Sequence, residues 1–287
     1  MALRILILGI NPFDSGKTTL ALQLGSWLVS QGRSVNYFKP VSGHNYWYRH
    51  EHTVVCTNER ALISADATAF SRAVGSDLPI VLMNPVHTLF VPARLDSRGQ
   101  PPVSSLGFAG WDSFLVMQRF TNADGENLRS TVLVASHLID NDTVMLSTDE
   151  AMALVGQATV MVVDRLDQFT EFEHHNLNRC VSSCYRRVES CSQIVLIESF
   201  NDSVWPWSEL DRVDVVIAVG PGNLLEFDAD KVKRAVDHLC RPESDIRAVT
   251  FPMMREMIRP MRNYRLVPRV GLSAGDLSHL MNRAELV

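Results

Sequence analysis

The chain has 287 residues, with 27 basic and 32 acidic side chains, a net charge of −5 and a pI near 6.0. This acidic balance argues against a nucleic-acid partner, which needs a broad basic surface. No apolar run reaches the ~20 residues of a membrane-spanning helix, and the five cysteines are not accompanied by a secretory signal. We therefore expect a cytoplasmic protein with reduced thiols and no membrane partner.

The N-terminal segment has the order of parts found in a phosphate-binding loop. Residues 4–8 are an apolar run that predicts a buried parallel strand, and a helix pattern starts at Lys17. Between them, the sequence GINPFDSGKTT supplies a glycine-containing loop. Backbone N–H groups in such a loop and in the first helical turn point at an anion. The residues expected to hold the nucleotide are Asn11, Pro12, Phe13, Asp14, Ser15, Gly16, Lys17, Thr18 and Thr19.

Individual side chains of this loop have separate expected roles. Lys17 places a point charge against the β- and γ-phosphates, and the Thr18 hydroxyl is placed to ligate Mg²⁺. Asn11 stands where the usual spacing has a glycine, and asparagine tolerates the left-handed backbone region better than most residues. Asp14 puts a carboxylate beside the phosphates, which is costly unless a cation compensates it, so a catalytic role is favoured. The alternative is an ordinary strand-to-helix turn with an exposed lysine.

The rest of the chain alternates strand and helix signals, which predicts an α/β fold. We expect a three-layer, doubly wound, mostly parallel sheet of the P-loop NTPase type, with an inserted hairpin and helix region. One domain over residues 1–287, with an insertion at about 94–158, is the simplest organisation. Further strands are predicted at residues 34–38, 159–163 (buried), 193–197, 214–219 and 246–251, and helices at about 59–74, 147–157, 169–189, 228–240 and 273–284.

The connections between these elements also carry signals. Residues 114–120 and 130–137 alternate in hydropathy and flank an Asp-Gly turn, so they predict a β-hairpin. A loop rich in histidine and aromatic residues is expected at 44–57, and a turn-rich region at 78–100. The tail has a loop with five arginines, which are Arg255, Arg259, Arg262, Arg265 and Arg269.

Polar residues at strand ends are candidates for the site, because ligands bind beyond the carboxyl ends of parallel strands. Lys39 either brings a second positive charge near the γ-phosphate or an acidic substrate, or is a solvated lysine. Asp66, within a helix pattern, either ligates Mg²⁺ or is an ordinary surface acid. Asp164 and Glu198 each end an apolar strand, which is the Walker B arrangement. The sequence leaves open which of these two is the main Walker B acid.

Two cysteines and two histidines raise the question of a metal site. Cys180 and Cys184 are spaced i, i+4 on a predicted helix, with His174 and His175 just upstream. No Cys-x-x-Cys pair is present, so a pair of partly buried helix cysteines is the preferred interpretation.

Several motifs occur in the order found in one family. They are GINPFDSGKTT, YFKPVSGHN (37–45), SADATAF (64–70), MNPVHTLFVPA (83–93) and VLIES (195–199). Together they resemble dethiobiotin synthetase and its relatives among the cobyrinic-acid amidating synthetases and MinD-like ATPases. The resemblance covers roughly residues 2–93 and 193–252.

The resemblance implies a seven-stranded, mostly parallel sheet that binds ATP (or GTP) and Mg²⁺. It implies metal contacts from Thr18, Asp66 and Glu198, and a substrate-facing Lys39. Asp14 matches the acidic residue that the family carries two places before the second glycine of the loop. The family typically works as a homodimer, so a homodimer is expected.

The chain also departs from the family. Its phosphate loop is one residue longer and not led by glycine, and Glu198 is followed by Ser-Phe-Asn-Asp instead of Gly-Ala-Gly-Gly. Phe200 obstructs the close backbone approach that glycines permit. The family's adenine-reading asparagine has no match at residues 248–252. The nucleotide and metal residues thus resemble the family, while biotin synthesis is not supported, and the chain looks more like a prokaryotic, archaeal-like P-loop ATPase or GTPase.

Two functions follow from these observations. The first is an ATP-dependent, ligase-like enzyme that phosphorylates a small acidic substrate, with ATP favoured over GTP. The alternative is a nucleotide-dependent switch or assembly ATPase whose inserted region binds a protein. A polynucleotide kinase is disfavoured by the acidic charge, although the arginine cluster at 255–269 keeps it in consideration.

Overall fold

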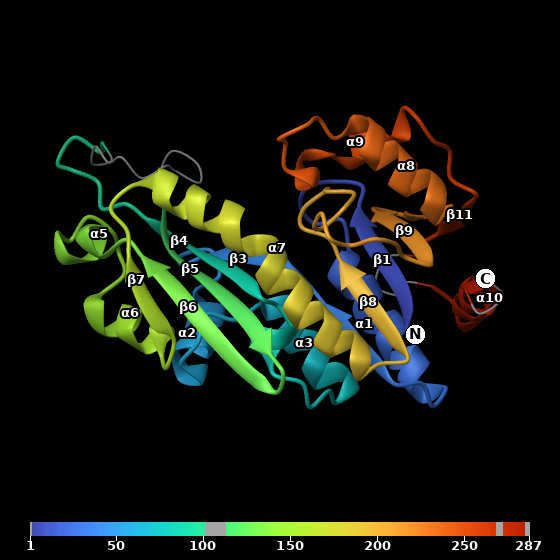
Figure 1. Cartoon of the computed structure of the whole chain (residues 1–287), viewed down its shortest axis with the longest axis horizontal. Helices are drawn as coiled ribbons and strands as arrows, with labels where there is room; N and C mark the ends of the chain where they lie inside the picture. Colours follow the sequence, from blue (N-terminus) through green and yellow to red (C-terminus); the bar gives the residue numbers. More distant parts are fainter. Residues whose placement is uncertain (1, 101–112, 268–271, 285–287) are drawn as a thin grey trace. The chain divides into compact units, whose positions relative to one another are not determined.

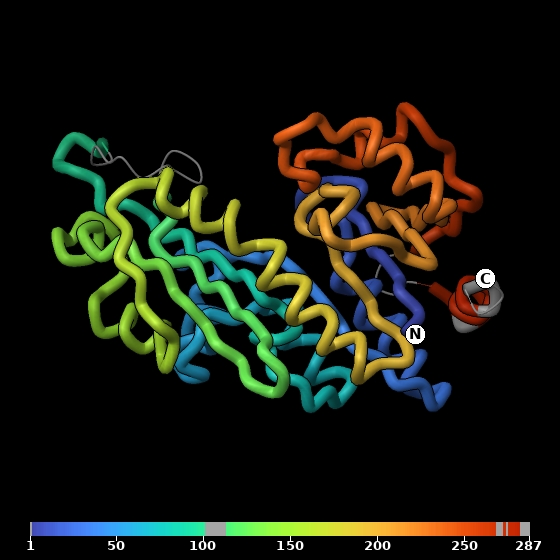
Figure 2. Tube along the Cα trace, in the orientation of Figure 1, coloured from blue at the N-terminus to red at the C-terminus, as the bar shows by residue number. Residues whose placement is uncertain are grey.

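The computed structural model describes residues 2–100, 113–267 and 272–284. Its chain forms two compact units, each made of segments that are distant in sequence (Figures 1 and 2). The first unit comprises Met1–Val41, Asp66–Met83 and Tyr185–Val287, and the second comprises Ser42–Ala65 and Asn84–Cys184. The insertion predicted at about 94–158 lies within the second unit, which also takes in the histidine-rich segment.

The first unit is built on a six-stranded sheet with the order β11-β10-β9-β1-β8-β2. Its strands are β1 (Leu3–Gly9), β2 (Val35–Phe38), β8 (Ile194–Glu198), β9 (Val215–Gly220), β10 (Asn223–Phe227) and β11 (Arg262–Arg265). The strands β9, β1, β8 and β2 run parallel, while β10 and β11 are antiparallel additions at one edge. Ile7 is paired with Glu198, so β1 and β8 end at the same edge of the sheet.

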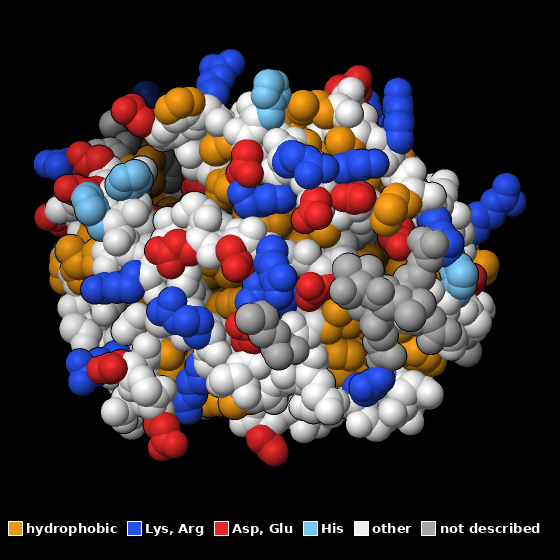
Figure 3. Space-filling model, turned by 45° about the vertical axis from the view of Figure 1, so that its right-hand side comes forward, with side chains coloured by type: hydrophobic (Ala, Val, Ile, Leu, Met, Phe, Trp, Pro, Cys, Tyr) orange, Lys and Arg blue, Asp and Glu red, His pale blue; other side chains and the backbone are white. Residues whose placement is uncertain are grey.

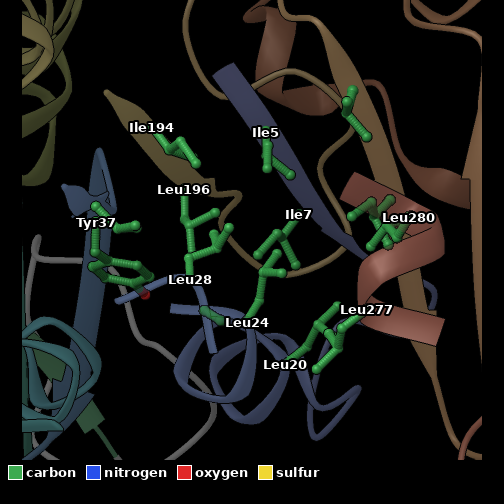
Figure 4. Packing of buried hydrophobic residues seen from close by; sticks show 14 of the residues in the cluster. Ile5, Ile7, Leu20, Leu24, Leu28, Tyr37, Ile194, Leu196, Leu277 and Leu280 are labelled. Carbon is green, nitrogen blue, oxygen red and sulfur yellow. The ribbon is translucent and has the colours of Figure 1, made fainter. Parts of the chain in front are cut away.

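The helices of this unit are α1 (Lys17–Ser30), α3 (Ala65–Val74), α4 (Ile80–Met83), α8 (Ala229–Leu239), α9 (Phe251–Arg255) and α10 (Ala274–Ala284), with a 3₁₀ turn at Ile246–Ala248. Leu20, Leu24 and Leu28 recur every four residues, so they form one apolar face of α1. Figure 4 shows this face turned toward Ile5 and Ile7 of β1. The contact anchors the helix that begins at Lys17.

The second unit contains a five-stranded sheet with the order β3-β4-β5-β6-β7. Its elements are β3 (Val41–Asn45), β4 (Val86–Pro92), β5 (Ser113–Asp124), β6 (Asn127–Val134), β7 (Thr159–Val162), α2 (His50–Glu59), α5 (Ser136–Asp140), α6 (Thr148–Val155) and α7 (Leu166–Ser190). The β4–β5 and β5–β6 pairs are antiparallel, and β7 pairs in parallel with β6. Helix α7 packs Phe172 on Phe120 of β5, and its last residues belong to the first unit.

The α/β class expected from the sequence is confirmed, but each of the two sheets is mixed. The predicted hairpin is also confirmed: β5 and β6 pair up to Asp124 and Asn127, and Gly125 adopts a φ of +58° in the turn. The strands expected near residues 34, 193 and 214 are β2, β8 and β9.

Other expectations were wrong. Residues 246–251 are not a strand but a 3₁₀ turn leading into α9, whereas the arginine-rich loop contains the strand β11. The pattern at 59–74 is not one helix, because α2 ends at Glu59 and α3 begins at Ala65. Likewise the loop expected at 44–57 contains most of α2, and the turn-rich region contains α4 and β4. Arg269 of the arginine cluster lies outside the described residues.

Strand β7 was expected to be buried, and it is exposed. Its residues Val160, Met161 and Val162 are 44%, 40% and 56% exposed, respectively. The reason is its position at the edge of the sheet, where β6 is its one partner among the described strands. A continuous apolar run does not by itself distinguish a central strand from such an edge strand.

Arg119 on β5 is the buried cation that organises the second unit. The side chain is 1% exposed. Its donors reach the carbonyl oxygens of Leu62 at 2.6 Å, Pro85 at 3.1 Å and Asn84 at 2.6 Å, the amide oxygen of Asn84 at 3.4 Å, and the Thr121 hydroxyl. A guanidinium has five N–H donors, and the Arg119 side chain has five acceptors within reach, so its donors are matched in number. Burial lowers the pKa of Arg119 to about 10, so the group stays charged at neutral pH.

Replacing Arg119 with methionine is expected to destabilise the protein by about 3 kcal/mol or more, because buried oxygens of Leu62, Asn84 and Thr121 lose a charged donor. Arg129→Met, an exposed position on β6, is the matched control and should change stability by less than about 0.5 kcal/mol. Urea unfolding of both variants measures the difference. Equal stability of the Arg119→Met variant and the parent would contradict the role given to this side chain.

Candidate functional site

The loop between β1 and α1 places Lys17 over the end of β1. Gly16 caps the helix with a φ of +91°, and Lys17 is the first helical residue. The Lys17 ammonium donates to the Asn201 carbonyl at 2.7 Å and to the Ser15 hydroxyl at 3.2 Å. A Cβ atom added to Gly9 would lie 2.7 Å from all three of these groups, namely the Lys17 ammonium, the Ser15 hydroxyl and the Asn201 carbonyl. Glycine is therefore required at the end of β1, so that the lysine can fold back across the backbone.

The first part of this loop differs from what the sequence suggested. Asn11, Pro12, Phe13 and Asp14 are exposed. The left-handed backbone conformation, expected at Asn11, falls on Asp14, which has a φ of +51°. The longer spacing is thus accommodated near the end of the loop. Ser15, Lys17 and Thr18 are turned inward, while Thr19 on α1 remains exposed.

A second lysine joins two carboxylates at the same edge of the sheet. The Lys39 ammonium follows β2 and donates to Oε1 of Glu198 at 2.8 Å and to the carboxylate of Asp66. Glu198 ends β8 and is 1% exposed, while Asp66 lies in the first turn of α3. The Thr18 hydroxyl donates to the same Glu198 oxygen at 3.2 Å. Four of the predicted side chains therefore meet, because the parallel strands end side by side.

The charges of this cluster stabilise one another. Burial alone would lower the pKa of Lys39, but the adjacent Glu198 and Asp66 carboxylates outweigh it and raise that pKa. Burial alone would raise the pKa of Asp66. The neighbouring Lys39 ammonium has the larger effect, so the pKa of Asp66 is lowered. Burial lowers the pKa of Lys17, whose described hydrogen bonds go to a hydroxyl and a carbonyl oxygen. The Lys39 ammonium is thus held between two carboxylates.

The donor set of this cluster fits a hard divalent cation. Thr18, Asp66 and Glu198 offer oxygen atoms, the ligand type that Mg²⁺ prefers, and a P-loop threonine with one or two acids is a common Mg²⁺ arrangement. In the structure the Asp66 and Glu198 carboxylates accept from the Lys39 ammonium, and the Thr18 hydroxyl donates to Glu198. A metal ion at these ligands therefore competes with Lys39 for the same carboxylates.

Two residues of this site were missed by sequence reasoning. The Tyr37 hydroxyl donates to Oε2 of Glu198 at 2.8 Å, and burial raises the pKa of Tyr37 well above its usual value, so the group remains a donor. Tyr37 and Lys39 are two residues apart at the end of β2, and this spacing places them on the same side and could have revealed the tyrosine. The Asn201 carbonyl, which accepts from Lys17, gave no side-chain signal; Asn201 itself has a φ of +48°.

Asp164, the competing Walker B candidate, belongs to the second unit. Its backbone N–H donates to the Gln168 side chain at 2.7 Å, and its carboxylate lies 3.8 Å from Nδ1 of His137. Asp164 thus contacts the start of α7 and, through its carboxylate, His137 of α5. Glu198 is the acid that shares the first unit with Lys17 and Thr18.

Comparison of the chain with protein-family models, curated proteins and solved structures finds no match. Among the described residues, no helix combines the length and apolar character needed to cross a membrane. Figure 3 shows basic and acidic side chains interspersed on the face that it presents. The site geometry itself therefore carries the functional argument.

The Asp66 carboxylate should contribute stability that depends on pH. Because its folded-state pKa is lowered, that contribution is full above the usual aspartate pKa of about 4 and is lost as pH falls through the folded-state value. Asp66→Asn should therefore destabilise the protein at pH 7 and progressively less below pH ~4. Urea unfolding over this range measures the effect, and Asp77→Asn, an exposed position in the same unit, is the control. A pH-independent loss would show that charge pairing with Lys39 is not the cause.

Proposed function

We propose that the first unit binds a nucleoside triphosphate with Mg²⁺, as a P-loop NTPase with a doubly wound, mostly parallel sheet. ATP is favoured over GTP on the family resemblance. The observation that carries this proposal is the position of the Lys17 ammonium at the end of β1, in hydrogen-bond contact with the Ser15 hydroxyl. The backbone at the start of α1 offers N–H groups to an anion in the same region.

The carboxylate pair supports the metal part of this proposal. Thr18, Asp66 and Glu198 would hold Mg²⁺, which neutralises charge on the β- and γ-phosphates when bound. Lys39 would then leave the carboxylates, because the cation takes over their charge. An ammonium released at this point is available to an anionic substrate, which explains why the site has a second lysine.

We propose that the reaction is phosphoryl transfer to a small acid. A carboxylate oxygen of the acid would attack the γ-phosphorus, the bond to the β-phosphate oxygen would break with its electron pair leaving on ADP, and an acyl phosphate would form. Lys17 would stabilise the transferring charge, and Lys39 would hold the acceptor. Asp14, exposed on the loop, would contact the substrate, and its negative charge would favour a substrate that also carries a proton or cation.

Lys17→Ala is expected to lower the affinity for ATP with Mg²⁺ by about 100-fold or more, because one preorganised charge at a phosphoryl group contributes several kcal/mol. Isothermal titration calorimetry measures it. Lys231→Ala, an exposed lysine on α8, is the matched control and should bind as the parent does. A folded Lys17→Ala variant with unchanged affinity would exclude the phosphate-loop assignment.

A second candidate is a nucleotide-dependent switch that binds a protein. It is favoured by β7, an edge strand of the second unit with three exposed apolar side chains, because unpaired strand edges can pair with another chain. In this case the nucleotide would control binding, and no acid would be phosphorylated.

Product analysis separates the two candidates. ADP release should be measured with ATP and Mg²⁺ alone, then with added bicarbonate or with individual mono- and dicarboxylic acids. The ligase-like function predicts ADP formation that depends on one acid and is stoichiometric with its phosphorylated or condensed product. Slow hydrolysis that no acid accelerates would contradict that function and favour the switch.

A further inference from the structure

Three histidines of the second unit converge in a place separate from the phosphate-loop residues in sequence. His44 lies on β3, His52 on α2 and His87 on β4, and one nitrogen from each lies within 4.8 Å of the others. Among the described residues, this is the one group of three or more such side chains with metal-binding spacing. Cys180 and Cys184, considered from the sequence, are buried free thiols of α7 and do not belong to it.

The protonation of His87 is fixed by a chain of hydrogen bonds. The Asn84 side chain donates its NH₂ to the Val86 carbonyl at 3.1 Å, so its oxygen is the acceptor for the Ser42 hydroxyl at 3.0 Å. Ser42 has given its only proton, and its oxygen therefore accepts from Nδ1 of His87 at 2.6 Å. Nε2 of neutral His87 consequently carries the lone pair.

Arg119 supports the direction of this chain. A guanidinium can only donate, and its Nη2 approaches the Asn84 side-chain oxygen at 3.4 Å. That contact favours the same amide orientation as the Val86 carbonyl does. The buried arginine thus helps to hold His87 in the tautomer that can ligate a metal through Nε2.

His52 is oriented by a backbone carbonyl. Its Nε2 lies 2.7 Å from the Ile63 carbonyl oxygen, which can only accept, so this nitrogen carries the proton. Nδ1 is then the nitrogen with the lone pair. Cys56 also donates to the Ile63 carbonyl at 3.5 Å, and its sulfur lies 3.5 Å from Nε2 of His52.

His44 connects the other two imidazoles. Its Nδ1 lies 2.7 Å from Nε2 of His87 and donates to it, while its Nε2 lies 3.1 Å from the Thr53 hydroxyl. Shifting the imidazole proton to Nε2 would free the Nδ1 lone pair, and Thr53 could accept that proton while donating to the Arg49 carbonyl, which lies 3.5 Å away.

We propose that His44, His52 and His87 form a binding site for a divalent transition-metal ion of the zinc class. One nitrogen of each ring lies within 4.8 Å of the others, and each ring also places a nitrogen against a hydroxyl or a carbonyl, from Thr53, Ile63 and Ser42, respectively. Such outer partners are the arrangement that orients metal-bound histidines. Imidazole ligands favour zinc, copper, iron or nickel over Mg²⁺.

The geometry needs only a modest adjustment. Tetrahedral ligands at about 2.0–2.1 Å from zinc lie about 3.3 Å from one another. Nδ1 of His44 and Nε2 of His87 must therefore separate by a few tenths of an ångström when the shared proton is replaced by the ion. His52 is the least buried of the three rings and can close the remaining distance.

Three imidazole ligands are neutral, so they do not reduce the +2 charge of the ion. They also leave its fourth coordination position free for another ligand. Zinc held by three histidines with a fourth position open is the arrangement of catalytic sites, and the ion lowers the pKa of bound water toward 7. Because the ligand set contains no carboxylate, the fourth ligand should be a hydroxide or an anionic group of a substrate.

Titration with Co²⁺ alone tests the proposal on the full chain after chelator treatment. We expect one Co²⁺ per chain, with the intense visible absorption of a four- or five-coordinate nitrogen site, and displacement by Zn²⁺. X-ray absorption of the zinc-loaded protein should show three imidazole ligands. Spectra that show the ion bound by six oxygen ligands would overturn the proposal, and this test needs no variant.

Variants localise the ion. His52→Gln should weaken Co²⁺ binding by at least about tenfold, and Ser42→Ala, which removes an outer partner, by about 10- to 100-fold. The His174→Gln/His175→Gln double variant removes two exposed histidines of the same unit and should bind as the parent does. Loss of binding in that double variant, or unchanged binding in a folded His52→Gln protein, would overturn the assignment. Lys17→Ala should bind Co²⁺ normally, which separates this test from that of the nucleotide site.

Discussion

The polar site of the first unit depends on the ion pairs that the buried Lys39 ammonium makes with Glu198 and Asp66. Burying a charge is costly unless opposite charges and hydrogen bonds compensate it, and Glu198 and Asp66 do so here. Glu198 in turn accepts from Thr18 and Tyr37, so the lysine fixes the positions of residues from β2, β8, α1 and α3. The same carboxylates are the proposed Mg²⁺ ligands, and competition between the ion and Lys39 would couple metal binding to substrate binding.

A second buried cation has the corresponding role in the other unit. Arg119 has no carboxylate partner among its described hydrogen bonds and is satisfied by carbonyl and hydroxyl oxygens instead. Since a guanidinium only donates, it also influences the direction of the hydrogen bonds that run through Asn84 and Ser42 to His87. In both units, a buried positive charge is held by oxygen acceptors that come from several different elements.

The sequence predicted those elements that have a strong local signal. The phosphate-loop strand, the helix at Lys17 and the Asp-Gly hairpin were found because spacing and turn chemistry specify them locally. The meeting of Lys39, Asp66 and Glu198 was expected from the rule for strand ends and from the family resemblance, and the structure brings these side chains together. Their roles in nucleotide chemistry stay predictions.

The remaining features depend on contacts that are distant in sequence. The short strands β10 and β11 exist because they pair with each other and with β9, and the exposure of β7 follows from its edge position. The histidine cluster joins residues 44, 52 and 87, and only the register of β3 against β4 and the start of α2 bring them together. No single-sequence pattern reveals which of nine histidines share a site.

The most direct test of the central claim is a crystal structure of the protein with Mg²⁺ and a non-hydrolysable ATP analogue. The account predicts phosphate oxygens within hydrogen-bond distance of the Lys17 ammonium, Mg²⁺ bound through Thr18 with Asp66 or Glu198, and Lys39 displaced from the carboxylates toward the γ-phosphate. A nucleotide bound elsewhere, or a phosphate in the loop while Lys39 still joins both carboxylates without a metal ion, would contradict it.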